Sequence, residues 1–257
     1  MFTQAKQAFL FALVFLTRLP VGRWMQKPGA HTSTQAVYFY PAVGVVIGIL
    51  LAAFSVALSG LGDFLNAALV LALWVGVTGA LHLDGLADCI DAYYAGHKCV
   101  DAEQRRERIL HVMHDPNCGA VALVSLVLLL LVKFSALASM ATSWQMVAAL
   151  IIAPVIARTA ILPFVALSEY ARYEGKVPDN LATNSQRLWL ITLLMSALAV
   201  LTLGLVSATI VVAAVAALLV YWRALWQQQI GGYTGDCLGA LVELTETLVL
   251  ITLVAVW

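Results

Sequence analysis

Three aspartates at helical spacing are the residues of this 257-residue chain whose types and positions best fit a chemical task. Asp84, Asp88 and Asp91 stand at positions i, i+4 and i+7, so on a helix they share one face. Carboxylates this close repel one another, and no basic residue stands between them. Hard divalent cations such as Mg²⁺ or Mn²⁺ prefer carboxylate oxygens. The spacing therefore predicts a metal site on this face, where Gly85 would let a backbone or a phosphate approach closely.

The alternative interpretation is an acidic helix face that water simply solvates. Leu83, Leu86 and Ile90 argue against it, because they give the same segment an apolar side directly after an apolar stretch. Further along, Asp115 is the next candidate metal ligand. A zinc site is another alternative, with the ligands His82, His111, His114 and Asp115. Their spacing is not the H-E-x-x-H pattern of a zinc helix, so we do not favour it.

Basic residues follow the aspartates in the amphipathic segment 101–115. Its cations are Arg105, Arg106 and Arg108. Arginine binds phosphate oxygens through pairs of hydrogen bonds, so arginines beside a metal–carboxylate site suit a diphosphate substrate. The alternative is a helix that lies on anionic lipid headgroups, and the two roles are compatible.

A second motif, GGYTGDCLGA at 231–240, precedes an apolar stretch. A flexible loop at the start of a helix can bind an anion or orient a carboxylate ligand. The segment is not a Walker sequence, because the Lys-Ser/Thr ending is missing. Its candidate substrate contacts are Gly231, Gly232, Thr234, Gly235 and Asp236.

Four ionisable residues lie inside or near apolar stretches. Lys133 and Arg158 are expected to have partners in a polar cavity, because charges within membrane segments rarely face lipid. Glu243 stands early enough in its stretch to reach a cytoplasmic cavity. Glu246 is deeper and could be protonated.

The composition places all of these residues in a membrane protein. The chain is 62% hydrophobic and 11% charged, whereas soluble domains are roughly half apolar and about a quarter charged. This excludes secreted, nucleic-acid-binding and disordered proteins. The predicted fold is an all-α, polytopic integral membrane helical bundle that forms one domain, 1–257, with amphipathic or interfacial helices on the cytoplasmic side. About seven stretches approach the roughly 20 residues of a span, at 36–59, 64–82, 118–138, 144–168, 187–204, 207–226 and 238–257.

The basic residues also predict the orientation of the bundle. They cluster before the first expected span, between the second and third, and between the fourth and fifth, where Arg172 and Lys176 stand. The opposite connections, near 60–63, 139–143 and 204–207, contain no Lys or Arg. Positive residues stay on the cytoplasmic side, so the N-terminus is expected there and the C-terminus on the far side. The apolar segment 9–16 is too short to span and is interpreted as interfacial or re-entrant.

Five motifs occur in order along nearly the whole chain. They are FLTRLPV at 15–21, YPAVG at 40–44, HLDGLAD at 82–88 with Asp91, the segment 106–115 with Gly119, and the glycine motif at 231–240. Together they resemble the cobalamin synthase family, adenosylcobinamide-GDP ribazoletransferase. The chain departs from the family's usual residues at His111, His114, Asn117 and 227–229.

The resemblance implies an enzyme for the last steps of cobalamin nucleotide-loop assembly. Its substrates would be adenosylcobinamide-GDP and α-ribazole, or α-ribazole 5′-phosphate, and its products adenosylcobalamin, or its 5′-phosphate, and GMP. Mg²⁺ would be the cofactor and the cytoplasmic (inner) membrane the location. Membrane lipid is an expected partner and nucleic acid is not, while a homo-oligomer and other nucleotide-loop enzymes are possible partners.

Residue roles follow from the resemblance as hypotheses. Asp84, Asp88 and Asp91 would hold one or two Mg²⁺ ions, with Asp115 next, and one aspartate or His82 would accept the hydroxyl proton. The candidate substrate contacts are Arg18, Gly85, Arg106, Arg108, Lys133, Arg158, Gly231, Gly232, Thr234, Gly235, Asp236 and Glu243. Two alternatives stay open. One is a CDP-alcohol phosphotransferase, although Asp88 stands where its D-G-x-x-A-R motif has Arg, and the other is a transporter.

Overall fold

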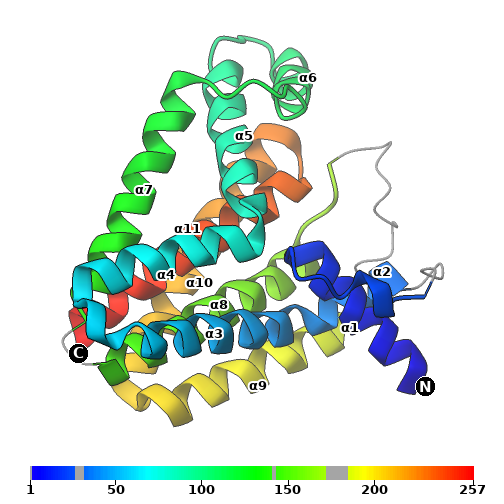
Figure 1. The fold of residues 1–257 in the computed structure, drawn as a ribbon. Coiled ribbons are helices and arrows are strands. Elements are labelled where there is room, and N and C mark those ends of the chain that lie inside the picture. Colours follow the sequence, from blue (N-terminus) through cyan, green and yellow to red (C-terminus); the bar gives the residue numbers. More distant parts are fainter. Residues whose placement is uncertain (1, 27–31, 141–142, 172–184) are drawn as a thin grey trace.

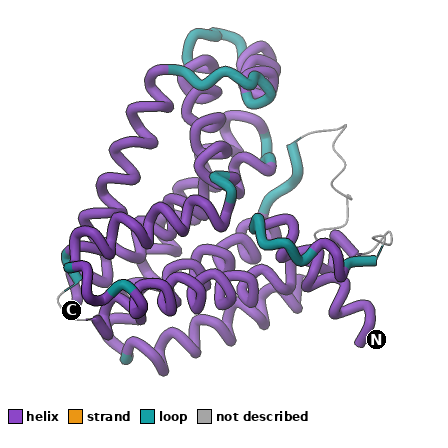
Figure 2. Tube along the Cα trace, viewed as in Figure 1, coloured by secondary structure: helices purple, strands orange, loops and turns teal. Residues whose placement is uncertain are grey.

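The computed structural model describes residues 2–26, 32–140, 143–171 and 185–257, and in these residues all regular structure is helical except for one isolated bridge between Tyr170 and Tyr233 (Figures 1 and 2). Three short 3₁₀ helices, at Gly22–Trp24, Val37–Phe39 and Ser59–Leu61, connect longer elements. The α-helices are α1 Phe2–Leu16, α2 Thr32–Ala36, α3 Tyr40–Ala57, α4 Asp63–Thr78, α5 Leu81–Gly96, α6 Ala102–Val112, α7 Ala120–Ala138, α8 Ser143–Leu167, α9 Ser185–Leu203, α10 Leu205–Ile230 and α11 Gly235–Val256.

The helices confirm the expected all-α membrane bundle. Among the described residues, six segments are long and apolar enough to cross a bilayer, and the pair α4–α5 makes a seventh if it counts as one broken span. In Figure 1 the turn between α3 and α4, the turn between α9 and α10, and the C-terminus lie at one end of the bundle, and α1 lies at the other. Which end faces the cytoplasm stays a prediction, as does the single domain. Arg172 and Lys176, on which the orientation partly depends, lie outside the described residues.

The second expected span, 64–82, is wrong at its carboxyl end. Helix α4 ends at Thr78, and α5 starts at Leu81 at an angle of 83° to it. The cause is local, because Gly79 at φ 62° and Ala80 at φ 56° both adopt the left-handed conformation and stop the helical hydrogen-bond pattern. The acidic helix therefore turns away from the span instead of continuing it (Figure 1).

Helices α8 and α11 form the buried centre of the bundle. The most apolar window of α11 is 72% buried and that of α8 is 67% buried, whereas α9 reaches only 11%. Figure 1 agrees, since α9 runs along the outer edge. Polar side chains on α8 and α11 are therefore shielded from lipid, which makes buried charges tolerable there.

Glycines bring α3 against α8 at backbone distance. A methyl group added at Gly48 would lie 2.6 Å from the Cα of Ile151, and one at Gly44 would lie 2.6 Å from the carbonyl oxygen of Pro154. Small residues allow such close approach between membrane helices, and the dispersion contacts that result hold the helices together. Any side chain at these positions must therefore separate the two helices.

A matched pair of glycine variants tests this packing. Gly48→Ala should lower the free energy of unfolding by roughly 1–3 kcal/mol, because its methyl group overpacks the α3–α8 contact. Gly76→Ala is the control, since Gly76 is also helical and has open space around its Cα. It should leave stability unchanged or raise it by roughly 0.4–1 kcal/mol. Thermal unfolding in detergent measures both, and equal effects of the two variants would contradict the packing argument.

Candidate active site at the junction of α5 and α11

Helix α5 lies on the start of α11 because glycine occupies both sides of the contact. A methyl group at Gly85 would lie 2.8 Å from the carbonyl oxygen of Asp236 and 3.1 Å from its Cα. One at Gly239 would lie 3.4 Å from the Cα of His82. The expected close approach at Gly85 is thus made by backbone, and it places Asp236 beside the acidic face of α5.

The aspartates of the two helices converge around this contact. Asp84 is exposed, and Asp88 and Asp236 are half-buried. The charges of Asp88 and Asp236 both act on the thiol of Cys89, which is buried and contacts Cys237 across the junction. Asp84, Asp88 and Asp236 are the acidic residues that α5 and the start of α11 bring to this junction, and we call them the junction carboxylates.

Two other expected ligands have different partners. The carboxylate of Asp91 accepts a hydrogen bond of 2.6 Å from the backbone N–H of Gly119 at the start of α7. Asp115 accepts hydrogen bonds from the backbone and side chain of Asn117 at 3.0 and 2.6 Å. These bonds stabilise the charged form and hold the pKa of Asp115 below its usual range. Asp91 and Asp115 thus hold the chain around α7 in place.

The junction carboxylates fit Mg²⁺, although they do not form a complete ligand cage. Within the described part of the chain, no three His, Cys, Asp or Glu side chains are already arranged to enclose a metal ion. Mg²⁺ does not need such a cage, because it commonly binds through one or two carboxylates and takes its other ligands from water and substrate phosphates. A helix face with Asp84 exposed suits that mode of binding.

The glycine motif has structural roles that the sequence did not reveal. Gly231, at φ 75°, ends α10 in the left-handed conformation. Gly232 has no room for a side chain because the carbonyl of Glu169 lies against it. The adjacent Tyr233 N–H donates to that carbonyl at 2.9 Å, and its own carbonyl accepts from the Ala171 N–H at 2.9 Å. The segment after α8 therefore covers Gly232, which leaves it no surface for a substrate, whereas Gly231 is exposed and stays a candidate contact.

The end of the motif opens on the junction. The hydroxyl of Thr234 accepts a hydrogen bond of 3.3 Å from the Cys237 N–H and thereby caps α11. Gly235, the first residue of that helix, is exposed and has open space around its Cα. Of the five expected contacts in this motif, Gly235 and Asp236 lie at the junction with α5, and Gly232 and Thr234 are buried.

The three candidate phosphate-binding arginines differ in their surroundings. Arg106 donates to the carbonyl oxygens of Ile230 and Ala171 at 3.2 and 2.9 Å, so it ties α6 to the end of α10 and does not act as a free clamp. Arg108 is exposed on α6. Arg18 is also exposed and lies over Gly79 at the bend between α4 and α5. Arg108 and Arg18 stay candidate substrate contacts.

The buried charges form one network across α7, α8 and α11. The ammonium of Lys133 lies 2.7 Å from the carboxylate of Glu243 and 2.6 Å from that of Glu246, and 4.7 Å from the ring centre of Trp74. The guanidinium of Arg158 contacts the other oxygen of Glu246. The four residues are at most 4% exposed. The expected partners of Lys133 and Arg158 are confirmed, and we call these four residues the buried ion network.

The network corrects several expectations about substrate binding. Lys133 contacts Glu243, Arg158 contacts Glu246, and these side chains lie in the interior and present no surface to a substrate. Glu246 contacts two cations, which favours its charged form over protonation. A buried carboxylate that contacts cations from two other helices holds the three helices together.

His82 belongs to the interior and not to the exposed acidic face. It is 3% exposed, it interacts electrostatically with Arg158, Glu246 and Lys133, and neither ring nitrogen has a hydrogen-bond partner among the described residues. The zinc alternative fails for the same reason, since His111 and His114 are exposed at the end of α6. As the proton acceptor, His82 ranks below the junction carboxylates.

Sequence reasoning missed three residues that shape the site. Gly119 holds Asp91, Glu169 pairs with the glycine motif, and Trp74 lies under Lys133. Gly119 stood within one of the five motifs, so that signal was present. Glu169 and Trp74 left no sequence signal, because their partners lie far away in the chain.

Comparison with known proteins agrees with this arrangement of motifs. Residues 8–254 match the family described as cobalamin-5-phosphate synthase. An adenosylcobinamide-GDP ribazoletransferase of Pseudomonas savastanoi pv. phaseolicola is 41% identical over 248 residues, 95% of this chain and 98% of the relative. Proteins of that name from Pseudomonas aeruginosa and Stutzerimonas stutzeri are each 41% identical, over 97% and 95% of this chain and 98% and 96% of the relative, respectively. No solved structure matches the chain.

The buried ion network yields a prediction about stability. Lys133→Met leaves Glu243 with no cation in contact, and breaking a buried pair in this way costs about 3–5 kcal/mol of unfolding free energy. Lys133→Met combined with Glu243→Gln removes one charge of each sign and leaves Arg158 paired with Glu246. The double variant should therefore be more stable than the single variant. Denaturant unfolding in detergent measures both, and a double variant no more stable than Lys133→Met would refute the pairing.

Proposed function

The chain belongs to the cobalamin-5-phosphate synthase family, and we propose that it performs its reaction at the junction of α5 and α11. The activity is that of an adenosylcobinamide-GDP ribazoletransferase, a transferase of cobalamin synthesis. Adenosylcobinamide-GDP and α-ribazole, or its 5′-phosphate, are converted to adenosylcobalamin, or its 5′-phosphate, and GMP. The main support for this site is the close approach of the Asp236 backbone to Gly85, because it brings together the two most specific motifs, at 82–88 and 231–240.

The reaction transfers the cobinamide phosphoryl group from the phosphate of GMP to the 5′-hydroxyl of the ribazole. The 5′-hydroxyl oxygen of the ribazole forms a bond to the phosphorus that is attached to cobinamide. The bond between that phosphorus and the oxygen bridging to the GMP phosphate breaks, and GMP leaves with the bridging oxygen. The new phosphodiester keeps the cobinamide phosphate. Such transfers depend on positioning and on neutralising phosphate charge more than on covalent chemistry.

The residues of the junction divide this work. Asp84, Asp88 and Asp236 would hold Mg²⁺, which when bound would neutralise the charge of the diphosphate. One of these carboxylates would accept the hydroxyl proton instead of holding the metal, and exposed Asp84 is the first candidate. Arg108 and Arg18 bind phosphate oxygens from the sides of the junction. Asp91 and Arg106 are positioning residues, because they fix α7 and α6 around it.

A membrane setting suits this substrate pair. The distribution of basic residues supports a cytoplasmic position at the inner membrane for the N-terminus and the junction, where soluble nucleotides arrive. A corrinoid is large and amphipathic, so apolar helices beneath the site can support it. The lipid phosphotransferase and the transporter are not favoured, because the chain matches the synthase family over 8–254. The buried charges that suggested a transporter are paired with one another.

The aspartate assignment is tested by Asp84→Asn. This substitution removes a charge and keeps the volume, so the protein should insert and unfold normally while turnover falls by about 100-fold or more. Asp101→Asn is the matched control, because Asn can replace Asp101 as the cap of α6 and should preserve turnover. Turnover of Asp84→Asn close to that of the control would reject Asp84 as a reacting or ligand residue.

The function itself is tested by release of GMP from adenosylcobinamide-GDP by the purified protein in liposomes. We expect release only when both α-ribazole and Mg²⁺ are present, with a corrinoid product that contains the ribazole. Release without ribazole would indicate a hydrolase. Equal release after removal of divalent cations would reject the proposed cofactor but keep the transferase.

A further inference from the structure

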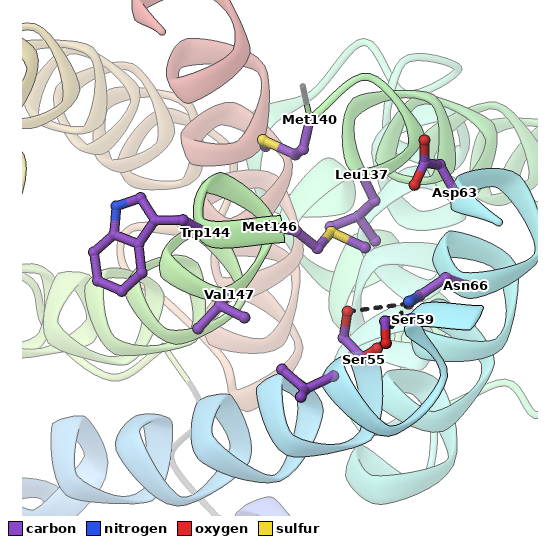
Figure 3. Close-up of a pocket in the computed structure, with 10 residues that line it drawn as sticks. Ser55, Ser59, Asp63, Asn66, Leu137, Met140, Trp144, Met146 and Val147 are labelled. Carbon is purple, nitrogen blue, oxygen red and sulfur yellow. Dashed lines mark hydrogen bonds between the residues drawn. The ribbon is translucent and has the colours of Figure 1, made fainter. Parts of the chain in front are cut away.

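A second pocket lies at the end of the bundle where α3 meets α4 and α7 meets α8, away from the junction of α5 and α11 (Figures 1 and 3). Its volume is about 410 Å³. Polar groups line one side, and Figure 3 shows Asp63 and Asn66 across the pocket from Trp144 and Val147. The volume falls within the range of small-ligand sites, roughly 300–1,000 Å³.

The polar side of this pocket is built in a fixed arrangement. The amide of Asn66 donates to the backbone carbonyl of Ser55 at 2.8 Å, and the Ser55 hydroxyl donates to the Asn66 side-chain oxygen at 3.0 Å. These two bonds join the end of α3 to the start of α4. Asp63 stands one turn before Asn66 and is the charged residue of the lining. Within the described part of the chain, no Lys or Arg forms an ion pair with it.

The rim of the pocket is apolar and faces outward. Of the lining residues, Trp144 is 72% exposed and Val56 is 57% exposed. Exposed Trp at the end of a membrane span is typical of the lipid headgroup level. A ligand that satisfies both parts must bring a cation to Asp63 and apolar chains to the rim.

We propose that this pocket binds the headgroup of an aminophospholipid such as phosphatidylethanolamine. Its primary ammonium donates hydrogen bonds to the carboxylate of Asp63 and to the hydroxyl of Ser59, which also lines the pocket. The acyl chains run outward over Val56 and Trp144. A volume of about 410 Å³ holds the headgroup and leaves the chains outside. Trimethylammonium lacks N–H donors, so phosphatidylcholine binds less well.

The wild-type protein provides the first test. It is reconstituted in nanodiscs of phosphatidylethanolamine, phosphatidylcholine and phosphatidylglycerol in equal amounts, and lipids that stay bound are counted by native mass spectrometry. Phosphatidylethanolamine should be retained about tenfold over either other lipid, the ratio expected for one charge-assisted contact. Equal retention of the three lipids would overturn the proposal.

Asp63→Asn tests the contact itself. It should abolish the preference for phosphatidylethanolamine, while Glu107→Gln on exposed α6 should keep it. An unchanged preference in Asp63→Asn would overturn the proposal. The last measurement is the binding of free phosphoethanolamine to the wild-type protein. If it binds the wild type and no lipid is enriched, the site takes a soluble amine and the lipid assignment is wrong. None of these readouts depends on the transferase activity, so the two proposals can fail separately.

Discussion

The position of Glu246 between Lys133 and Arg158 is the interaction on which the rest of the fold depends. An unpaired charge at membrane depth is too costly to keep, so three helices must bring their ionised groups to one place. Because Lys133 belongs to α7, Arg158 to α8 and Glu246 to α11, satisfying these charges fixes the three helices relative to one another. The contacts also fix the orientation of the Glu246 side chain, because one carboxylate oxygen contacts Lys133 and the other contacts Arg158.

Once α11 is fixed, its first turn is fixed too, and that turn carries Asp236. Helix α5 can lie on it because Gly85 and Gly239 remove side chains from the contact. The chain reaches this position only by the sharp bend at Gly79 and Ala80, which turns the acidic helix away from α4. The candidate site therefore depends on three structural features: the buried charges, the glycine contact and the bend.

The sequence predicted the parts of this arrangement that depend on local pattern. Apolar length located the spans, and a spacing of i, i+4, i+7 placed the aspartates on one helix. It failed where distant residues decide the outcome. Lys133 and Glu243 are 110 positions apart, and nothing in either segment identifies the other. Both positions are glycine, so the sequence alone could not distinguish their roles. Gly232 makes room for the backbone of Glu169, whereas Gly235 opens on the junction.

The surroundings of the five aspartates Asp84, Asp88, Asp91, Asp115 and Asp236 show why residue type alone does not predict a metal ligand. Asp91 and Asp115 have carboxylates like that of Asp84, but hydrogen bonds from Gly119 and Asn117 already stabilise their charge. A cation bound by carboxylates of neighbouring helices also relieves the repulsion between those carboxylates. The proposed Mg²⁺ is expected at Asp84, Asp88 and Asp236, where aspartates of two helices meet, and Asp236 also accepts a hydrogen bond of 3.2 Å from the Thr234 hydroxyl. A diphosphate there would add further negative charge, so the proposed Mg²⁺ and the substrate should each strengthen the binding of the other.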